Sequence, residues 1–133
     1  MLPIGVFPVN RGTPALLAAA VVTGRVLGLP PPVAYLVGDI GRGGGSRSLY
    51  AFLTEKIGGE NHDVMVFHYL QPDVDWHGRV LFALRDMARR PILIADAGYM
   101  YVAKMSGQAE EYDFFTPSIP EDLSCIWSHG LRR

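Results

Sequence analysis

Ile92-Leu93-Ile94-Ala95-Asp96 is a short apolar run that ends in a carboxylate, and Thr116-Pro117-Ser118-Ile119-Pro120-Glu121 is a polar turn sequence further along the chain. Short apolar runs of this length are typical of buried strands. In α/β proteins, ligands gather outside the carboxyl ends of parallel strands. The two stretches therefore predict a ligand crevice lined by Asp96 and by the turn that ends at Glu121.

Short apolar runs alternate with segments of helical periodicity along the rest of the chain. Helices are expected at residues 13–26, 46–57, 75–89 and 99–105, and strands at 33–37, 64–70, 92–95 and 114–116, with 4–9 as a candidate edge strand. Strands separated by helices of this length indicate βαβ units with right-handed crossovers. We therefore predict a single α/β domain over residues 1–133, with three layers: a short, mainly parallel sheet and helices on both faces.

The same periodicity predicts helix ends and core-facing stripes. Thr13 is a suitable N-cap before Pro14, and Gly28 followed by three prolines should end that helix. The predicted core stripes consist of Leu49, Phe52, Leu53 and Ile57 in one helix and Trp76, Val80, Leu84, Met87 and Ala88 in the next. Asp75 is the expected cap of the second of these helices.

Composition excludes several classes of function. Of the 133 residues, 49% are hydrophobic and 19% charged, which is typical of a globular chain. The net charge of -1 argues against a general nucleic-acid-binding surface. The apolar run at residues 15–22 is too short to span a bilayer, and Cys125 is the only cysteine, so no internal disulfide can form. We expect a cytoplasmic protein that binds neither nucleic acid nor membrane.

The charged residues and the potential metal ligands are expected to have structural roles rather than roles in a functional site. Arg85, Arg89 and Arg90 are expected to complement the negative end of a helix dipole. The four histidines, His62, His68, His77 and His129, lack metal-binding spacing, so packing or surface roles are favoured and no metal site is predicted. The Asp73-x-Asp75 pair is expected to serve as turn and cap. A buried helix face or the wall of a ligand pocket explains Tyr99 and Met100 equally well.

The loop at residues 38–46 contains five glycines and joins a predicted strand to a predicted helix. Such loops let the backbone approach an anion closely. Two specific motifs fail: Gly44 stands where a Walker A loop needs lysine, and Ser46 stands where the dinucleotide fingerprint needs its last glycine. Contact with an anion or ligand is favoured, and a plain connector is the alternative.

Taken together, these segments resemble the ribokinase-like superfamily, and within it the NAD(P)H-hydrate dehydratase branch of the carbohydrate kinases. That branch has a glycine-rich loop with an adjoining helix, then a strand ending in an Asp-Ala-Asp-Ala-type motif, then a Thr-Pro-His-Pro-Gly-Glu turn. Ile94-Ala95-Asp96-Ala97-Gly98 is similar to the first motif, with Ala95 in place of its leading Asp. The stretch from Thr116 to Glu121 is similar to the second motif at Thr, Pro and Glu. The resemblance covers residues 33–121.

The resemblance implies a crevice in which Asp39 and Asp96 bind a small-molecule substrate. It implies contacts with phosphate or nucleotide from a larger set: Gly41, Gly43, Gly44, Gly45, Ser46, Thr116 and Glu121. The implied cofactor is ATP or ADP with Mg²⁺. The implied chemistry is phosphoryl transfer to a hydroxyl group, or the related nucleotide-driven dehydration, with positioning and charge neutralisation carrying most of the catalysis.

Two rival functions follow from departures from these patterns. The family's Gly-Thr-Gly-Asp segment, which supplies its anion hole and catalytic base, has no counterpart in residues 122–133. That favours a truncated or diverged relative acting as a non-catalytic interaction or assembly subunit, whose sheet is completed by a partner chain, as in a homo-oligomer. The second rival is a Rossmann-type NAD(P)-binding protein, which the failed dinucleotide fingerprint disfavours.

Overall fold

The computed structural model describes residues 12–96 and 98–117. The candidate edge strand at residues 4–9 lies outside the described residues, as do Glu121, Cys125 and His129. The chain divides into two compact units, Met1–Tyr35 and Leu36–Arg133.

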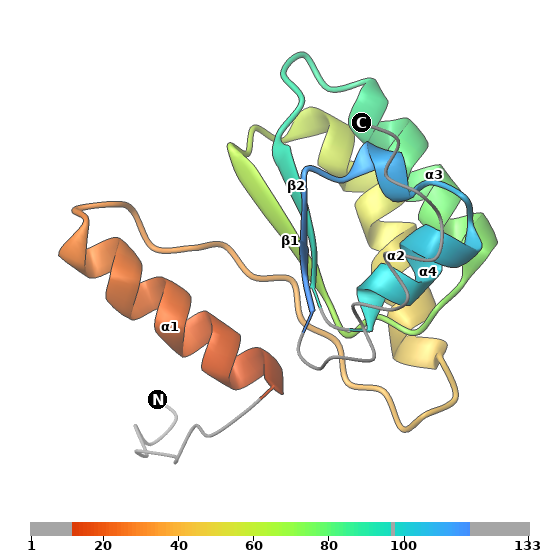
Figure 1. The fold of residues 1–133 in the computed structure, drawn as a ribbon, viewed down its shortest axis with the longest axis horizontal. Helices are drawn as coiled ribbons and strands as arrows, with labels where there is room; N and C mark the ends of the chain where they lie inside the picture. The colour runs from red at the N-terminus through yellow and green to blue at the C-terminus, as the bar shows by residue number, and fades with distance from the viewer. Residues whose placement is uncertain (1–11, 97, 118–133) are drawn as a thin grey trace. The chain divides into compact units, whose positions relative to one another are not determined.

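Helices and strands alternate along the described residues, which makes the chain a mixed α/β protein with a small parallel sheet (Figure 1). The elements are α1 (Gly12–Val26), α2 (Gly44–Lys56), β1 (Val64–His68), α3 (Val74–Arg85), β2 (Ile92–Asp96), α4 (Tyr99–Met105) and β3 (Phe114–Thr116), with 3-10 turns at Ile57–Gly59 and Ala109–Glu111. All four predicted helices and the last three predicted strands are confirmed. No described helix has both the length and the apolar character needed to cross a membrane.

Helix α1 belongs to the first unit and ends as the sequence predicts. Gly28 adopts φ of 68°, and the N–H of Leu29 donates to the carbonyl of Gly24 at 2.8 Å, a pattern that closes a helix C-terminus. The predicted strand at residues 33–37 is wrong, because residues 29–40 have no regular structure. A strand needs a neighbour for its backbone groups, and no strand pairs with this stretch among the described residues.

The sheet of the second unit has the order β1-β2-β3, and both pairs are parallel. Each strand is thus added next to the one before it, in the same direction across the sheet. When the crossovers are right-handed, this order places the connecting helices on one face of the sheet. Figure 1 shows α2, α3 and α4 together on one side of this sheet. Four apolar side chains on the other face are exposed: Val64, Val66, Ile92 and Phe114.

The core lies between the sheet and these three helices. Phe67, Leu93 and Ala95 point into it from the strands. The helices contribute Tyr50, Leu53, His77, Val80, Leu81, Leu84, Met100, Val102 and Ala103, all buried. This corrects the predicted stripes: Phe52 is 39% exposed and Ala88 is exposed, whereas Tyr50 and His77 are fully buried.

The start of α3 explains the shifted stripe. Asp73, not Asp75, is the N-cap, and its carboxylate accepts from the N–H of Trp76 at 3.2 Å. The helix therefore begins at Val74 and its buried residues recur from His77 with spacings of three and four. The prediction that Asp75 caps this helix is wrong.

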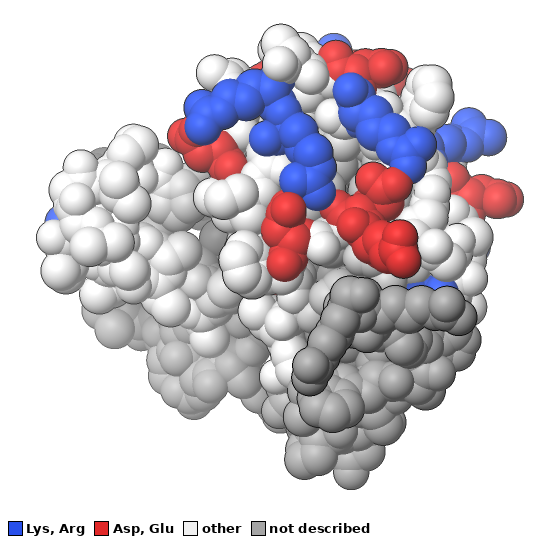
Figure 2. Space-filling view, turned by 45° about the horizontal axis from the view of Figure 1, so that its top comes forward, with Lys and Arg blue, Asp and Glu red and all other residues white. Residues whose placement is uncertain are grey.

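The arginines of the predicted dipole cluster each pair with an acidic side chain from another segment, and Figure 2 shows basic and acidic side chains side by side. The pairs are Arg85–Glu111, Arg89–Asp63 and Arg90–Asp113. Only Arg85 lies within α3; Arg89 and Arg90 follow the end of the helix. Because Asp63, Arg90 and Asp113 precede the three strands, these pairs lie at the amino edge of the sheet.

Candidate functional site

Each strand of the sheet ends in a polar residue at its carboxyl edge. The parallel register places His68 opposite Asp96 and Asp96 opposite Thr116. The Nδ1 of His68 lies 2.7 Å from Oδ2 of Asp96, and the hydroxyl of Thr116 donates to Oδ1 of the same carboxylate. Asp96 thus joins all three strands through one row of hydrogen bonds. This row, His68–Asp96–Thr116, is called the polar row below.

The imidazole of His68 is held in place at one nitrogen and unpaired at the other. Its side chain is 10% exposed, and that of Asp96 is 19% exposed. The Nε2 atom is buried and has no hydrogen-bond partner among the described residues. Because buried polar atoms nearly always have partners, this atom is the least satisfied feature of the edge.

The glycine loop before α2 is folded around the carboxylate of Asp39. Its Oδ1 accepts from the N–H groups of Gly41, Arg42 and Gly43, at 3.0 to 3.1 Å. Its Oδ2 accepts from the N–H and the hydroxyl of Ser46, at 3.1 and 3.2 Å. These are the donors that a glycine-rich loop and a helix N-terminus would offer to a phosphate. Here the protein's own carboxylate occupies them.

The glycines are required by the conformation of this loop. Gly41 and Gly43 have φ of 83° and 74°, in the left-handed region that other residues rarely adopt. A Cβ on Gly45 would lie 2.1 Å from the carbonyl oxygen of Gly38, whereas Gly44 has open space at that position. The loop is therefore a shaped turn around Asp39, and this conformation accounts for the glycines.

Removing the Asp39 carboxylate is expected to disorder this loop. In Asp39→Ala, amide hydrogen exchange at Gly41, Gly43 and Ser46 should accelerate about tenfold or more, because each N–H loses its acceptor. Asp75→Ala, which removes an exposed carboxylate from the first turn of α3, is the matched control. Equal exchange rates in the two variants would contradict the role of the Asp39 carboxylate in holding the loop.

The same hydrogen bonds make the loop sensitive to acid. The Ser46 N–H, followed by those of Gly43 and Arg42, lowers the pKa of Asp39 below its ordinary value of 3.8, against a smaller opposing effect of burial. The carboxylate's contribution to stability is therefore fully present above about pH 3.8. It is lost as pH falls through the lower pKa of the folded state.

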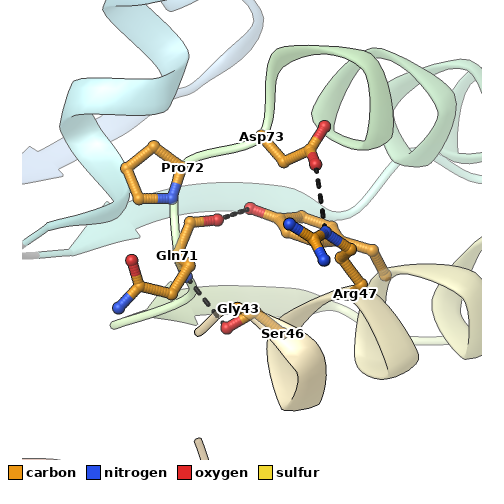
Figure 3. Close-up of a pocket in the computed structure, with 7 residues that line it drawn as sticks. Gly43, Ser46, Arg47, Gln71, Pro72 and Asp73 are labelled. Carbon is orange, nitrogen blue, oxygen red and sulfur yellow. Dashed lines mark hydrogen bonds and ion pairs between the residues drawn. The ribbon is translucent and has the colours of Figure 1, made fainter. Parts of the chain in front are cut away.

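Ser46 connects the glycine loop to the segment after β1. Its hydroxyl donates to Asp39 and accepts from the N–H of Gln71 at 3.0 Å, and the side chain is buried. Figure 3 shows this contact together with the ion pair of Arg47 and Asp73, 3.9 Å apart, and all four residues line one small hollow. The hollow measures about 30 Å³ and so accommodates one water-sized group.

A buried aromatic cluster supports the site from the helix side of the sheet. The hydroxyl of Tyr50 donates to the carbonyl of Gln71 at 3.1 Å, and the rings of Phe67 and Tyr99 stack with centres 4.9 Å apart. Burial, more than any neighbouring charge, raises the pKa values of Tyr50, Tyr99 and Tyr112 well above 10. These phenols are therefore neutral packing groups, and Tyr99 and Met100 belong to the core.

The structure brings the predicted site residues into two clusters. Asp96 and Thr116 meet in the polar row, and Asp39 meets Ser46 and the glycines in the loop. Glu121 lies outside the described residues. Among residues 12–96 and 98–117, no group of three or more His, Cys, Asp or Glu side chains is arranged to hold a metal ion.

Sequence reasoning missed His68, Gln71 and Arg47 at this edge. His68 had a detectable signal, since it ends an apolar strand as Asp96 does, and carboxyl ends of parallel strands lie at one edge. Gln71 contributes to the site through its backbone N–H and carbonyl, and Arg47 through the end of a long, exposed side chain. No residue pattern predicts such contacts.

Comparison with known proteins finds a relative that matches part of this chain. The chain is 33% identical over 84 residues to an uncharacterized protein of Methanocaldococcus jannaschii; the match covers 63% of this chain and 32% of the relative. The chain thus spans about a third of the length of that relative. No protein-family model matches the chain, and no solved structure matches it.

Proposed function

We propose that this chain is a ribokinase-like nucleotide- and small-molecule-binding domain, with its ligand at the carboxyl edge of β1, β2 and β3. The observation that carries the proposal is the polar row, in which the last residues of three parallel strands meet around Asp96. The carboxyl edge is where α/β folds bind ligands. The resemblance of the segments around Asp96 and Thr116 to ribokinase-like motifs supports the same location.

The proposal extends to ATP or ADP with Mg²⁺ as cofactor and to a kinase or hydrate-dehydratase reaction. A nucleotide phosphate that binds at the glycine loop takes over the donors now engaged by Asp39, because the same N–H groups suit either anion. Displacement of Asp39 is thus part of nucleotide binding in this proposal. We also propose that the protein acts in the cytoplasm.

The proposal includes a three-layer arrangement. Parallel sheets almost always have both faces covered, and in the second unit α2, α3 and α4 cover one face. The other face carries exposed Val64, Val66 and Ile92. A further helical layer over these residues would complete the domain.

A thermal-shift titration with ATP, ADP and NAD(P)H, each with and without Mg²⁺, tests this function. Nucleotide at 100 times its dissociation constant should stabilise the fold by about 2.7 kcal/mol, which raises Tm by about 10 °C. Asp96→Ala should weaken nucleotide binding about tenfold, because it removes the acceptor that holds the hydroxyl of Thr116 in place. Asp86→Ala removes the same charge from an exposed position at the end of α3 and should leave affinity unchanged.

The rival functions give different results in this titration. Stabilisation by NAD(P)H without a Mg²⁺ requirement would favour the Rossmann-type alternative. A well-folded sample that no nucleotide stabilises would favour the non-catalytic subunit. Unchanged affinity in Asp96→Ala would remove the carboxyl edge from consideration as the binding site.

A further inference from the structure

The polar row determines which nitrogen of His68 carries a proton. Both oxygens of Asp96 accept: Oδ1 from the hydroxyl of Thr116 and Oδ2 from Nδ1 of His68. An ionised carboxylate has no proton to donate, so the 2.7 Å contact requires a proton on Nδ1. In the neutral imidazole the other nitrogen, Nε2, then carries a free lone pair. Asp96 therefore presents His68 as a hydrogen-bond acceptor.

That acceptor is buried without a donor among the described residues. A buried acceptor left without a donor destabilises the folded protein, and this penalty disappears when a hydroxyl or amide donates to it. The side chain that carries this atom is nine-tenths buried and anchored at its other nitrogen. The lone pair is thus held in one direction, as a binding group for a ligand must be.

Tyr69 adds a second unusual feature beside the imidazole of His68. It is the one described residue other than glycine with positive φ, at 52°, and its ring centre lies 4.1 Å from that of His68. Strained backbone of this kind is concentrated at functional sites. The side chain of Tyr69 is 58% exposed, so it can rotate away from the imidazole without disturbing the core.

We propose that His68 binds the substrate directly, with Nε2 accepting a hydrogen bond from a hydroxyl group of a small polyhydroxylated compound. Asp96 acts through His68 as its positioning residue, and Thr116 orients Asp96. Rotation of Tyr69 admits the substrate. This inference rests on the proposed function and revises one detail of it, because the residue that touches substrate is His68 rather than Asp96.

The same geometry gives His68 a place in phosphoryl transfer from a nucleoside triphosphate. The substrate hydroxyl gives its proton to Nε2 while its oxygen forms a bond to the γ-phosphorus. The bond from that phosphorus to the bridging oxygen breaks, and its electron pair leaves with the nucleoside diphosphate. The resulting imidazolium is stabilised by Asp96 at Nδ1.

NMR of the full chain with ¹⁵N-labelled histidine tests the inference without nucleotide. His68 should show a protonated Nδ1 and an unprotonated Nε2, and its ring signals should move saturably when D-ribose, glycerol or myo-inositol is added. The methyl signal of Thr116 serves as a second reporter. Asp96→Asn should change the protonation pattern of the ring, because an amide can donate to Nδ1.

His68→Asn is the decisive variant. Its amide N–H can occupy the place of Nδ1–H and retain the bond to Asp96, but it has no group at the position of Nε2. Probe affinity, followed at the Thr116 methyl, should fall about tenfold, and the fold should be kept. Wild-type affinity in this variant, a proton on Nε2, or no response to any of the three probes would overturn the inference.

These results are independent of the nucleotide titration. Saturable probe binding without any nucleotide effect would support the hydroxyl site and remove the kinase assignment. Nucleotide binding in a protein whose His68 signals ignore every probe would retain the proposed function and overturn this inference alone.

Discussion

Gly45→Ala is expected to lower the free energy of unfolding by about 2–4 kcal/mol. The new Cβ would lie 2.1 Å from the carbonyl oxygen of Gly38 and 2.9 Å from its carbonyl carbon. Both atoms are backbone, so no rotamer change relieves the overlap. The Gly38 backbone cannot move freely either, because the neighbouring Asp39 is held by five hydrogen bonds from the loop.

Gly44→Ala is the matched control for this substitution. It makes the same chemical change one residue earlier in α2, where no atom lies within 4 Å of the new Cβ. Stability should therefore stay within about 0.5 kcal/mol of wild type or rise slightly. Chemical denaturation of both variants measures the difference. Similar stabilities would show that the close approach of Gly38 and Gly45 is not a feature of the folded protein.

His77→Gln is expected to lower the stability at pH 8 by about 1–3 kcal/mol. His77 is fully buried; its Nδ1 lies 3.1 Å from Oε1 of Gln108, and its Nε2 lies 2.8 Å from the hydroxyl of Tyr112. These contacts suit a neutral ring that donates through Nδ1 and accepts through Nε2. Glutamine is too short and differently shaped to satisfy both neighbours, so at least one of them loses its partner.

The same residue should make the protein less stable in mild acid. Burial lowers the pKa of His77 below its ordinary value of 6.5, against a smaller opposing effect of the Gln108 hydrogen bond. In the pH range between the lowered pKa and 6.5, the unfolded chain therefore binds more protons than the folded one. The contribution of His77 is fully present above about pH 6.5 and is lost as pH falls through that range.

Urea denaturation between pH 8 and pH 5 measures this effect. The wild-type free energy of unfolding should fall across the interval, and the fall should be smaller in His77→Gln, which has no group to protonate at this position. Parallel pH profiles for the two proteins would show that His77 is not the group responsible.

Local sequence determined the elements and their order. Capping residues and apolar periodicity are properties of neighbouring residues, so the four helices and the strands β1, β2 and β3 could be predicted from the chain without its fold. The run at residues 33–37 shows where this reasoning fails. Its composition suits a strand, but a strand exists only where another strand pairs with it, and pairing is not encoded locally.

The candidate site divides in the same way. Sequence alone determined that Asp96 and Thr116 end neighbouring strands and that residues 38–46 form a glycine-rich turn at the start of a helix. Tertiary structure decided that His68 joins Asp96 and Thr116 and that His77 is buried in place of Trp76. The reason is physical: hydrogen bonds and burial depend on strand register and helix rotation, which packing of the whole unit sets.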